Sequence, residues 1–100
     1  MKLTKIADNS FDEIRTGLSG PLQEVYEAWM AHGPATTRRL ARAGRIRLLN
    51  VRPRTSELVS IGLVQLTAHH RGEGVYRARR QEEWERWAER QNVTKGDKAR

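Results

Sequence analysis

The sequence of 100 residues contains no cysteine, three prolines, six aromatic residues and no long hydrophobic run. Without cysteine the chain has no disulfide framework, no Cys-type zinc finger and no thiol nucleophile. Its longest apolar runs are far shorter than the roughly 20 residues that span a bilayer, and no signal-peptide pattern opens the chain. We therefore expect one small cytoplasmic domain that is held together by packing and has no membrane partner.

The sequence also lacks the residue patterns of common catalytic and metal sites. It has no His–carboxylate–Ser spacing, no paired carboxylates in apolar surroundings and no phosphate-binding glycine loop. The adjacent His69 and His70 lack a further ligand at the spacing that a metal site requires. We therefore predict a protein that is not an enzyme and that holds no metal and no cofactor.

The basic residues are concentrated in the middle of the chain. In total, 19 Lys and Arg residues and 12 Asp and Glu residues give a net charge of +7. Residues 1–34 carry a net charge of −2 and residues 81–100 a net charge of zero, whereas residues 35–80 carry eleven arginines and two glutamates, a net charge of +9. Positive charge concentrated in one segment favours the binding of a polyanion. Arginine is well suited to this, because it donates two hydrogen bonds at once to phosphate or guanine. A surface that serves only solubility would not require this clustering.

Capping signals and apolar periodicity predict the first two helices. Residues 1–9 are expected to form a loose arm. Ser10 and Glu13 match a capping box, in which each side chain accepts a backbone N–H of the other residue, and they predict a short helix over residues 11–16. Apolar side chains at helical spacing then predict a helix over residues 21–31, whose aromatic residues belong to the core.

Two further helices are predicted within the arginine-rich segment. Thr36 or Thr37 is placed to cap a helix that ends at Gly44. A connection longer than a minimal turn follows. Asn50 is then placed to cap a helix over residues 51–61.

Beyond Gly62 the apolar period changes from helical to about two residues. Residues around Val64 and Tyr76 are predicted to form two short strands, with a polar, glycine-rich loop over residues 68–74 between them. A C-terminal helix is expected over residues 81–91, followed by a disordered basic tail.

The segments TTRRLARAGRI, NVRPRTSELVSIGLV and QLTAHHRGEGVYRA carry a family resemblance. Together they resemble a winged helix-turn-helix domain of the kind found in small prokaryotic and phage-borne DNA-binding proteins. The resemblance implies an α+β, mainly α fold, in which a three-helix core and a two-stranded β-hairpin wing are flanked by a short N-terminal helix and a C-terminal helix. The expected divisions are the arm and short helix over 1–20, the winged domain over 21–79, the helix over 80–91 and the tail over 92–100.

The resemblance also implies that the helix over residues 51–61 lies in the major groove of double-stranded DNA. The expected base contacts are Arg52, Pro53, Ser56 and, in part, Arg54. Pro53 is expected in the first turn of the helix, where its missing N–H costs nothing. Both arginines can bind guanine O6 and N7 through two hydrogen bonds. Two interpretations of Glu57 stay open: it accepts from a cytosine amino group, or it pairs with Arg54 or Arg38.

Phosphate contacts are expected from helix N-termini and from the wing over residues 68–75. Free N–H groups and the helix dipole favour an anion at a helix N-terminus. The expected phosphate contacts are Thr36, Thr37, Arg38, Asn50, His70, Arg71 and Arg77, with His69 beside the wing tip. The other arginines either add to this surface or form a merely solvated face: Arg39, Arg42, Arg45 and Arg47.

The two tryptophans on one side of the C-terminal helix, Trp84 and Trp87, leave two interpretations open. They pack back onto the helical core, or they form contacts in a homodimer that reads a two-fold DNA site.

The sequence therefore predicts a sequence-specific, double-stranded DNA-binding protein, a transcriptional regulator of prokaryotic, phage or mobile-element origin. Two alternatives stay open: a non-catalytic winged-helix docking module in a protein assembly, and an accessory DNA-binding factor in replication, recombination or packaging. RNA ranks lower as a partner, because the sparse exposed aromatic residues give no stacking platform.

Overall fold

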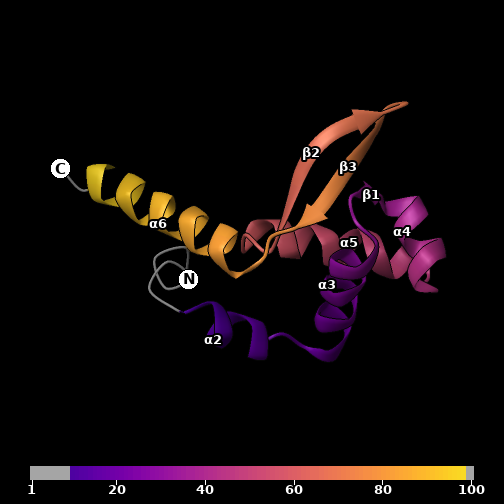
Figure 1. The fold of residues 1–100 in the computed structure, drawn as a ribbon, viewed down its shortest axis with the longest axis horizontal. Helices are drawn as coiled ribbons and strands as arrows, with labels where there is room; N and C mark the ends of the chain where they lie inside the picture. Colours follow the sequence, from indigo (N-terminus) through magenta and orange to yellow (C-terminus); the bar gives the residue numbers. More distant parts are fainter. Residues whose placement is uncertain (1–9, 99–100) are drawn as a thin grey trace.

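The computed structural model describes residues 10–98 and has an α+β, mainly helical fold, so the expected fold class is confirmed at this level. Figure 1 shows α3, α4 and α5 beside the sheet, with α6 pointing away from them. The predicted arm over residues 1–9 lies outside the described residues. In chain order the elements are α2 (Phe11–Thr16), α3 (Gly20–His32), β1 (Ala35–Thr36), α4 (Thr37–Gly44), α5 (Leu48–Ser60), β2 (Val64–His70), β3 (Glu73–Ala78) and α6 (Gln81–Lys98).

Side-chain caps begin the first two described helices. The Ser10 hydroxyl accepts the N–H of Glu13 at 3.1 Å, and the Glu13 carboxylate accepts the N–H of Ser10 at 2.9 Å, so the predicted capping box of α2 is confirmed. In α3 the hydroxyl of Ser19 accepts a backbone N–H, and Pro21 lies in the first turn, where its missing N–H costs nothing. Helix α3 extends one residue further at each end than the predicted range of 21–31.

Helices α3, α4 and α5 pack around a shared apolar core. Each contributes a large, fully buried side chain: Trp29, Leu40 and Leu58. The indole N–H of Trp29 donates to the buried hydroxyl of Thr55 at 3.0 Å, which pairs both polar groups and fixes α5 against α3. Gly44 allows a close approach of α4 to α3, because a Cβ there would lie 3.2 Å from the Cβ of Ala28.

Helix α5 begins at Leu48 and not at the predicted residue 51. Asn50 is therefore not the N-cap, which corrects the sequence prediction. The N-cap is Arg47, whose carbonyl accepts the N–H groups of Asn50 and Val51 at 2.8 and 3.0 Å. Leu48 packs against the core, and this burial favours the earlier start of the helix.

Pro53 consequently lies inside α5 rather than in its first turn. Proline lacks the N–H that would donate to the carbonyl of Leu49, and the exposed side chain of Leu49 shows that this part of the helix faces solvent, where water can satisfy the carbonyl. The earlier start also removes the long connection expected from the sequence, because residues 45–47 alone join α4 to α5.

The strands form a three-stranded antiparallel sheet in the order β1–β3–β2, so the predicted two-stranded hairpin gains a third strand. The added strand β1 pairs with Val75 and Tyr76 of β3 immediately before α4 begins. Two residues are too few for an alternating pattern, so the sequence does not reveal this strand. The ring of Tyr76 lies 5.8 Å from that of Trp29, which connects the sheet to α3.

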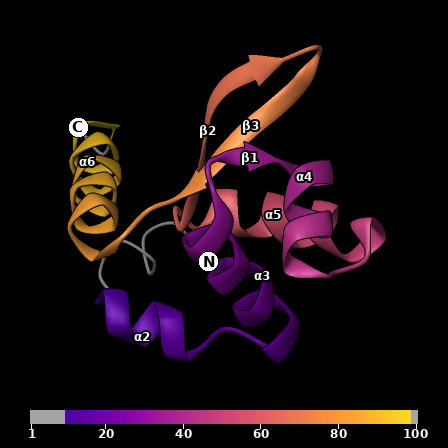
Figure 2. The ribbon, with the colours of Figure 1, turned by 45° about the vertical axis from the view of Figure 1, so that its right-hand side comes forward.

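The hairpin of β2 and β3 has longer strands and a tighter turn than predicted. Residues 68–70, expected in a loop, belong to β2, and β3 begins at Glu73. The pairing of His70 with Glu73 leaves only Arg71 and Gly72 in the turn, with φ values of 53° and 81°. Two successive positive φ values give the turn whose twist matches that of the strands. The hairpin therefore projects from the helices as a narrow two-stranded ribbon, as Figures 1 and 2 show.

Helix α6 continues through Lys98, beyond the predicted end at residue 91. Residues 92–98, expected to form a disordered tail, thus belong to a helix, because extending an existing helix adds one hydrogen bond for each residue fixed. Residues 99 and 100 of the predicted tail lie outside the described residues. In the part of the chain that the structure describes, no helix is long and apolar enough to cross a membrane.

Candidate functional site

Helix α4, helix α5 and residues 45–47 between them carry seven arginines. Six arginines are exposed and Arg54 is half-buried. Among the described side chains, Arg38 is the one member of this set that forms an ion pair. Most of the positive charge is therefore not neutralised by neighbouring carboxylates. We call this set the arginine surface: Arg38, Arg39, Arg42, Arg45, Arg47, Arg52 and Arg54.

Helix α5 presents most of the predicted base-contact residues on its accessible side. Arg52, Pro53 and Ser56 are exposed, whereas Arg54 is half-buried. Arg52 Nε donates to the Thr37 hydroxyl at 3.5 Å, a long hydrogen bond that directs the arginine toward the start of α4. The structure therefore brings Arg52 to the N-terminus of α4, and Arg52 and Ser56 line one groove with Thr37.

The predicted phosphate contacts at the start of α4 differ in accessibility. Thr36 is the N-cap: its hydroxyl accepts the N–H of Arg39 at 3.2 Å, and the residue is 7% exposed. Its side chain is thus occupied within the fold, which corrects the expected phosphate contact at Thr36. Thr37 is half-buried, and Arg38 is exposed. Asn50, in the first turn of α5, is also exposed.

A groove of about 360 Å³ separates the hairpin from α4 and α5. The carboxylate of Glu73, on the hairpin side, lies 3.4 Å from Arg38 Nε. Glu57 was one partner of Arg38 that the sequence left open; the partner in the structure is Glu73, which the pairing of β1 with β3 brings near α4. The groove is lined by Thr37, Arg52, Thr55, Ser56, Gly72, Glu73, Gly74 and Tyr76.

The end of the hairpin carries a second group of basic side chains. His69, His70 and Arg71 are all exposed. A hollow of about 310 Å³ lies between β1 and the outer part of β2 and is bounded by both histidines and by Arg39. Among the described residues, no three His, Cys, Asp or Glu side chains are grouped so that they could hold a metal ion.

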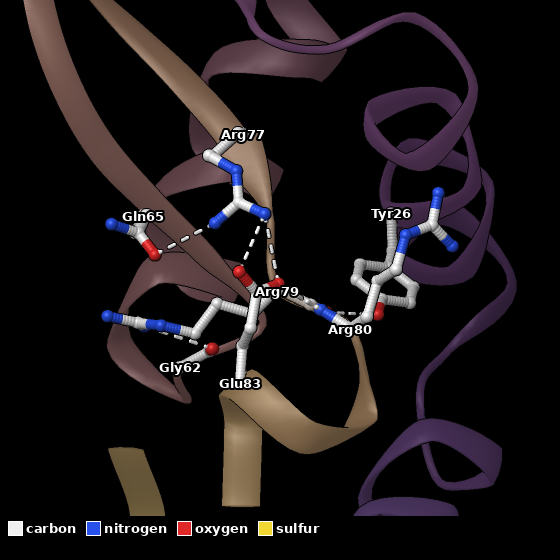
Figure 3. A network of polar contacts seen from close by, with 7 residues as sticks. All are labelled: Tyr26, Gly62, Gln65, Arg77, Arg79, Arg80 and Glu83. Carbon is white, nitrogen blue, oxygen red and sulfur yellow. Dashed lines mark hydrogen bonds and ion pairs between the residues drawn. The ribbon is translucent and has the colours of Figure 1, made fainter. Parts of the chain in front are cut away.

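Arg77, another predicted phosphate contact, is held at the base of the hairpin (Figure 3). Its Nη2 lies 2.8 Å from one carboxylate oxygen of Glu83, and its Nη1 donates to Gln65 at 3.2 Å. Glu83 also accepts the backbone N–H of Arg80 at 3.0 Å. This N–H and the hydrogen bond and charge of Arg77 hold the pKa of Glu83 below its ordinary value. Arg77 therefore joins the hairpin to α6, and its expected phosphate contact stays a prediction.

Arg79 has a structural role in the same region (Figure 3). Its carbonyl accepts the hydroxyl of Tyr26 at 2.7 Å, and its Nη1 donates to the carbonyl of Gly62 at 3.1 Å. The guanidinium also lies 5.7 Å from the centre of the Trp87 ring. Burial raises the pKa of Tyr26 and lowers that of Arg79. These contacts fix the start of α6 against α3 and against the segment that follows α5.

The structure distinguishes the two tryptophans of α6. Trp84 is 1% exposed, its ring lies 5.9 Å from that of Phe11, and its indole N–H donates to the carbonyl of Ile61 at 2.9 Å. A side chain buried within its own chain is not available to a partner, so the expected dimer contact at Trp84 is corrected in favour of core packing. Trp87 is half-buried and lies over Gly62.

Leu49 lies on the exposed side of α5 and is not among the residues predicted from the sequence. Its side chain is 78% exposed in the first turn of α5. Once the helix starts at Leu48, Leu49 shares a face with Pro53 and Ser56 at spacings of four and seven residues. Leu48 packs against the core, which marks the earlier start of the helix. A helix that starts at Leu48 would have predicted the exposed position of Leu49.

No protein-family model, no curated protein and no solved structure matches this chain.

Proposed function

We propose that this protein is a winged helix-turn-helix protein that binds double-stranded DNA in a sequence-specific manner. The observation that carries the proposal is the arginine surface, of which only Arg38 forms an ion pair among the described side chains. A cationic surface along two adjacent helices is the electrostatic footprint of a nucleic-acid-binding protein. The connection of residues 45–47 supports the proposal, because helix-turn-helix pairs are joined by about 3–4 residues.

Helix α5 is the recognition helix of this proposal and lies in the major groove. Arg52 binds guanine O6 and N7 through two hydrogen bonds, and Ser56 donates to or accepts from more than one base. Pro53 and Leu49 form the apolar part of the same exposed face, and Leu49 contacts the methyl group of a thymine. Arg54 lies at the edge of this face because its side chain is half-buried.

The helix N-termini and the hairpin contact the DNA backbone on either side of the recognition helix. Thr37 and Arg38 supply donors at the start of α4, and Asn50 does so in the first turn of α5. His70 and Arg71 supply them at the end of the hairpin. Contacts of this kind set the register of the protein on the duplex and provide most of the salt-dependent affinity.

We extend the proposal to regulation of transcription in a prokaryote, phage or mobile element, without catalysis. A base-reading helix flanked by backbone contacts is what selective occupancy of a DNA site requires. Occupancy of a two-fold site by a homodimer is part of this proposal, with the half-buried Trp87 rather than the buried Trp84 available to a partner.

The proposal is tested by selecting a preferred site from random duplexes and measuring binding by fluorescence anisotropy. Arg52→Ala is expected to reduce the preference for the selected site over random duplex by about tenfold, because a bidentate base contact is lost. Arg86→Ala is the matched control, since Arg86 is an exposed arginine on α6. If both variants lose the same affinity for every duplex, α5 is not the recognition helix. Absence of duplex binding by the unmodified protein at low salt would contradict the proposal as a whole.

A further inference from the structure

Two arginines have a backbone conformation that side chains rarely adopt. Among the described residues, Arg45 and Arg71 are the non-glycine positions with positive φ, at 57° and 53°. In this left-handed region the Cβ of an L-residue crowds the following carbonyl, so glycine is favoured and asparagine is tolerated. An arginine at such a position contributes less to folding than glycine would.

Arg45 ends helix α4 in the arrangement that usually requires glycine. Its N–H donates to the carbonyl of Arg42 at 3.3 Å, and the next N–H, of Ile46, donates to the carbonyl of Ala41 at 2.9 Å. This pair of hydrogen bonds defines a Schellman motif, whose left-handed residue is most often glycine. Gly44 stands one position earlier, where it is needed for the close packing of α4 on α3.

Arg71 occupies the first position of the two-residue hairpin turn, which also favours glycine, asparagine or aspartate. Gly72 follows it, and a Cβ at Gly72 would meet nothing within 4 Å. The turn is therefore open to solvent, and packing does not select the arginine. The side chain of Arg71 is exposed, like that of Arg45.

Arg45 belongs to the arginine surface, and Arg71 is the turn neighbour of Gly72, which lines the same groove as Thr37 and Arg52. Figures 1 and 2 show the hairpin turn and the connection between α4 and α5 on the side away from α6. Among the described side chains, neither arginine forms an ion pair with a carboxylate. Each guanidinium can therefore donate two parallel hydrogen bonds to one phosphate group.

We propose that Arg45 binds a DNA backbone phosphate, as Arg71 does at the hairpin turn, and that both arginines occupy positions where glycine would make the fold more stable. The inference rests on the proposed function and adds Arg45 to its backbone contacts. Arg45 and Arg71 would then hold the duplex from two separate loops. Since phosphates are the same in every sequence, both residues contribute to affinity and not to the choice of site.

The experiment compares Arg45→Gly and Arg71→Gly with the unmodified protein in thermal unfolding and in duplex binding. Each variant is expected to melt about 3–5 °C higher, because the disfavoured backbone conformation is relieved. Each is expected to bind selected and random duplexes several-fold more weakly, with a salt slope smaller by about one unit. A purely structural arginine would not move stability and affinity in opposite directions.

Arg45→Asn and Arg71→Asn provide a second pair of variants, since asparagine tolerates positive φ without the added freedom of glycine. Arg86→Ala on α6 is the control for loss of one exposed arginine. The inference is overturned if the unmodified protein binds DNA while the glycine and asparagine variants bind equally tightly, or if none of them melts higher. A failure of the unmodified protein itself to bind duplex DNA would contradict the proposed function instead.

Discussion

Arg38 Nε lies 3.4 Å from a carboxylate oxygen of Glu73, and this ion pair joins the first turn of α4 to the start of β3. Both side chains are accessible, with exposed fractions of 57% and 39%. An ion pair this exposed contributes little to stability. We expect a larger effect on the proposed DNA binding, because the pair partly neutralises an arginine of the arginine surface and places a negative charge beside the groove.

Replacing Glu73 tests this effect on binding. Glu73→Gln is expected to raise the affinity for all duplexes by about 3- to 10-fold at low salt, since the variant removes a charge that repels phosphate and frees Arg38. The free energy of unfolding should change by less than about 1 kcal/mol. Fluorescence anisotropy and urea denaturation measure the two quantities. Glu89→Gln, on α6, is the control, and an unchanged or weaker affinity of Glu73→Gln would contradict the prediction.

The proposed contact of Leu49 with thymine is tested by removing single methyl groups from the DNA. In the selected site, replacing each thymine by uracil in turn is expected to weaken binding about fivefold at one position, which corresponds to about 1 kcal/mol for a buried methyl group. Leu49→Ala should bind both versions of that site equally. Leu66→Ala, which changes another exposed leucine, should keep the difference. If no uracil substitution matters, Leu49 does not read thymine.

The helices with local signals are the part of the fold that the sequence predicts well. The reciprocal hydrogen bonds of Ser10 and Glu13 fix the start of α2, and the Thr36 cap fixes the start of α4. These signals involve residues three positions apart, so they can be read without knowledge of the tertiary structure.

Features that depend on distant residues could not be predicted in this way. Strand β1 exists because β3 offers it a pairing partner 39 and 41 residues later, at the pairs Thr36–Val75 and Ala35–Tyr76. The role of Arg77 depends on Glu83, whose position follows from the packing of α6. The same limit hides the ion pair of Arg77 from the sequence. At the sequence level, a paired arginine and a free one look alike.

Gly62 determines how closely α6 approaches the core. A Cβ at Gly62 would clash with the Trp87 ring, and its φ is 85°. Gly62→Ala is expected to destabilise the protein by about 3 kcal/mol or more, because overpacking adds to backbone strain. Gly72→Ala is the matched control, since Gly72 has a φ of 81° but no neighbour within 4 Å, and should cost only about 1 kcal/mol. Urea denaturation measures the free energy of unfolding of both variants. Equal losses of stability would show that Trp87 does not pack as described.

Glu83 is expected to make stability depend on pH. Its pKa in the folded protein is below the ordinary value of 4.5, because it accepts the N–H of Arg80 and pairs with Arg77. Its contribution to stability is therefore fully present above pH 4.5 and is lost as the pH falls through the folded pKa. Glu83→Gln should lower the urea midpoint at neutral pH and show a smaller further decrease in acid than the unmodified protein. Glu82→Gln, an exposed neighbour, should retain the full acid dependence, and the same profile for both variants would contradict the assignment.

Binding of duplex DNA by the arginine surface is the central proposal for this protein. The most direct test is the affinity of the unmodified protein for a labelled duplex over a range of salt concentrations, with single-stranded DNA and RNA of equal length as competitors. We predict a clear preference for the duplex and a log–log salt slope of about −0.9 for each phosphate contacted, hence a steep dependence. A flat salt dependence, or equal affinity for RNA and duplex, would contradict the account.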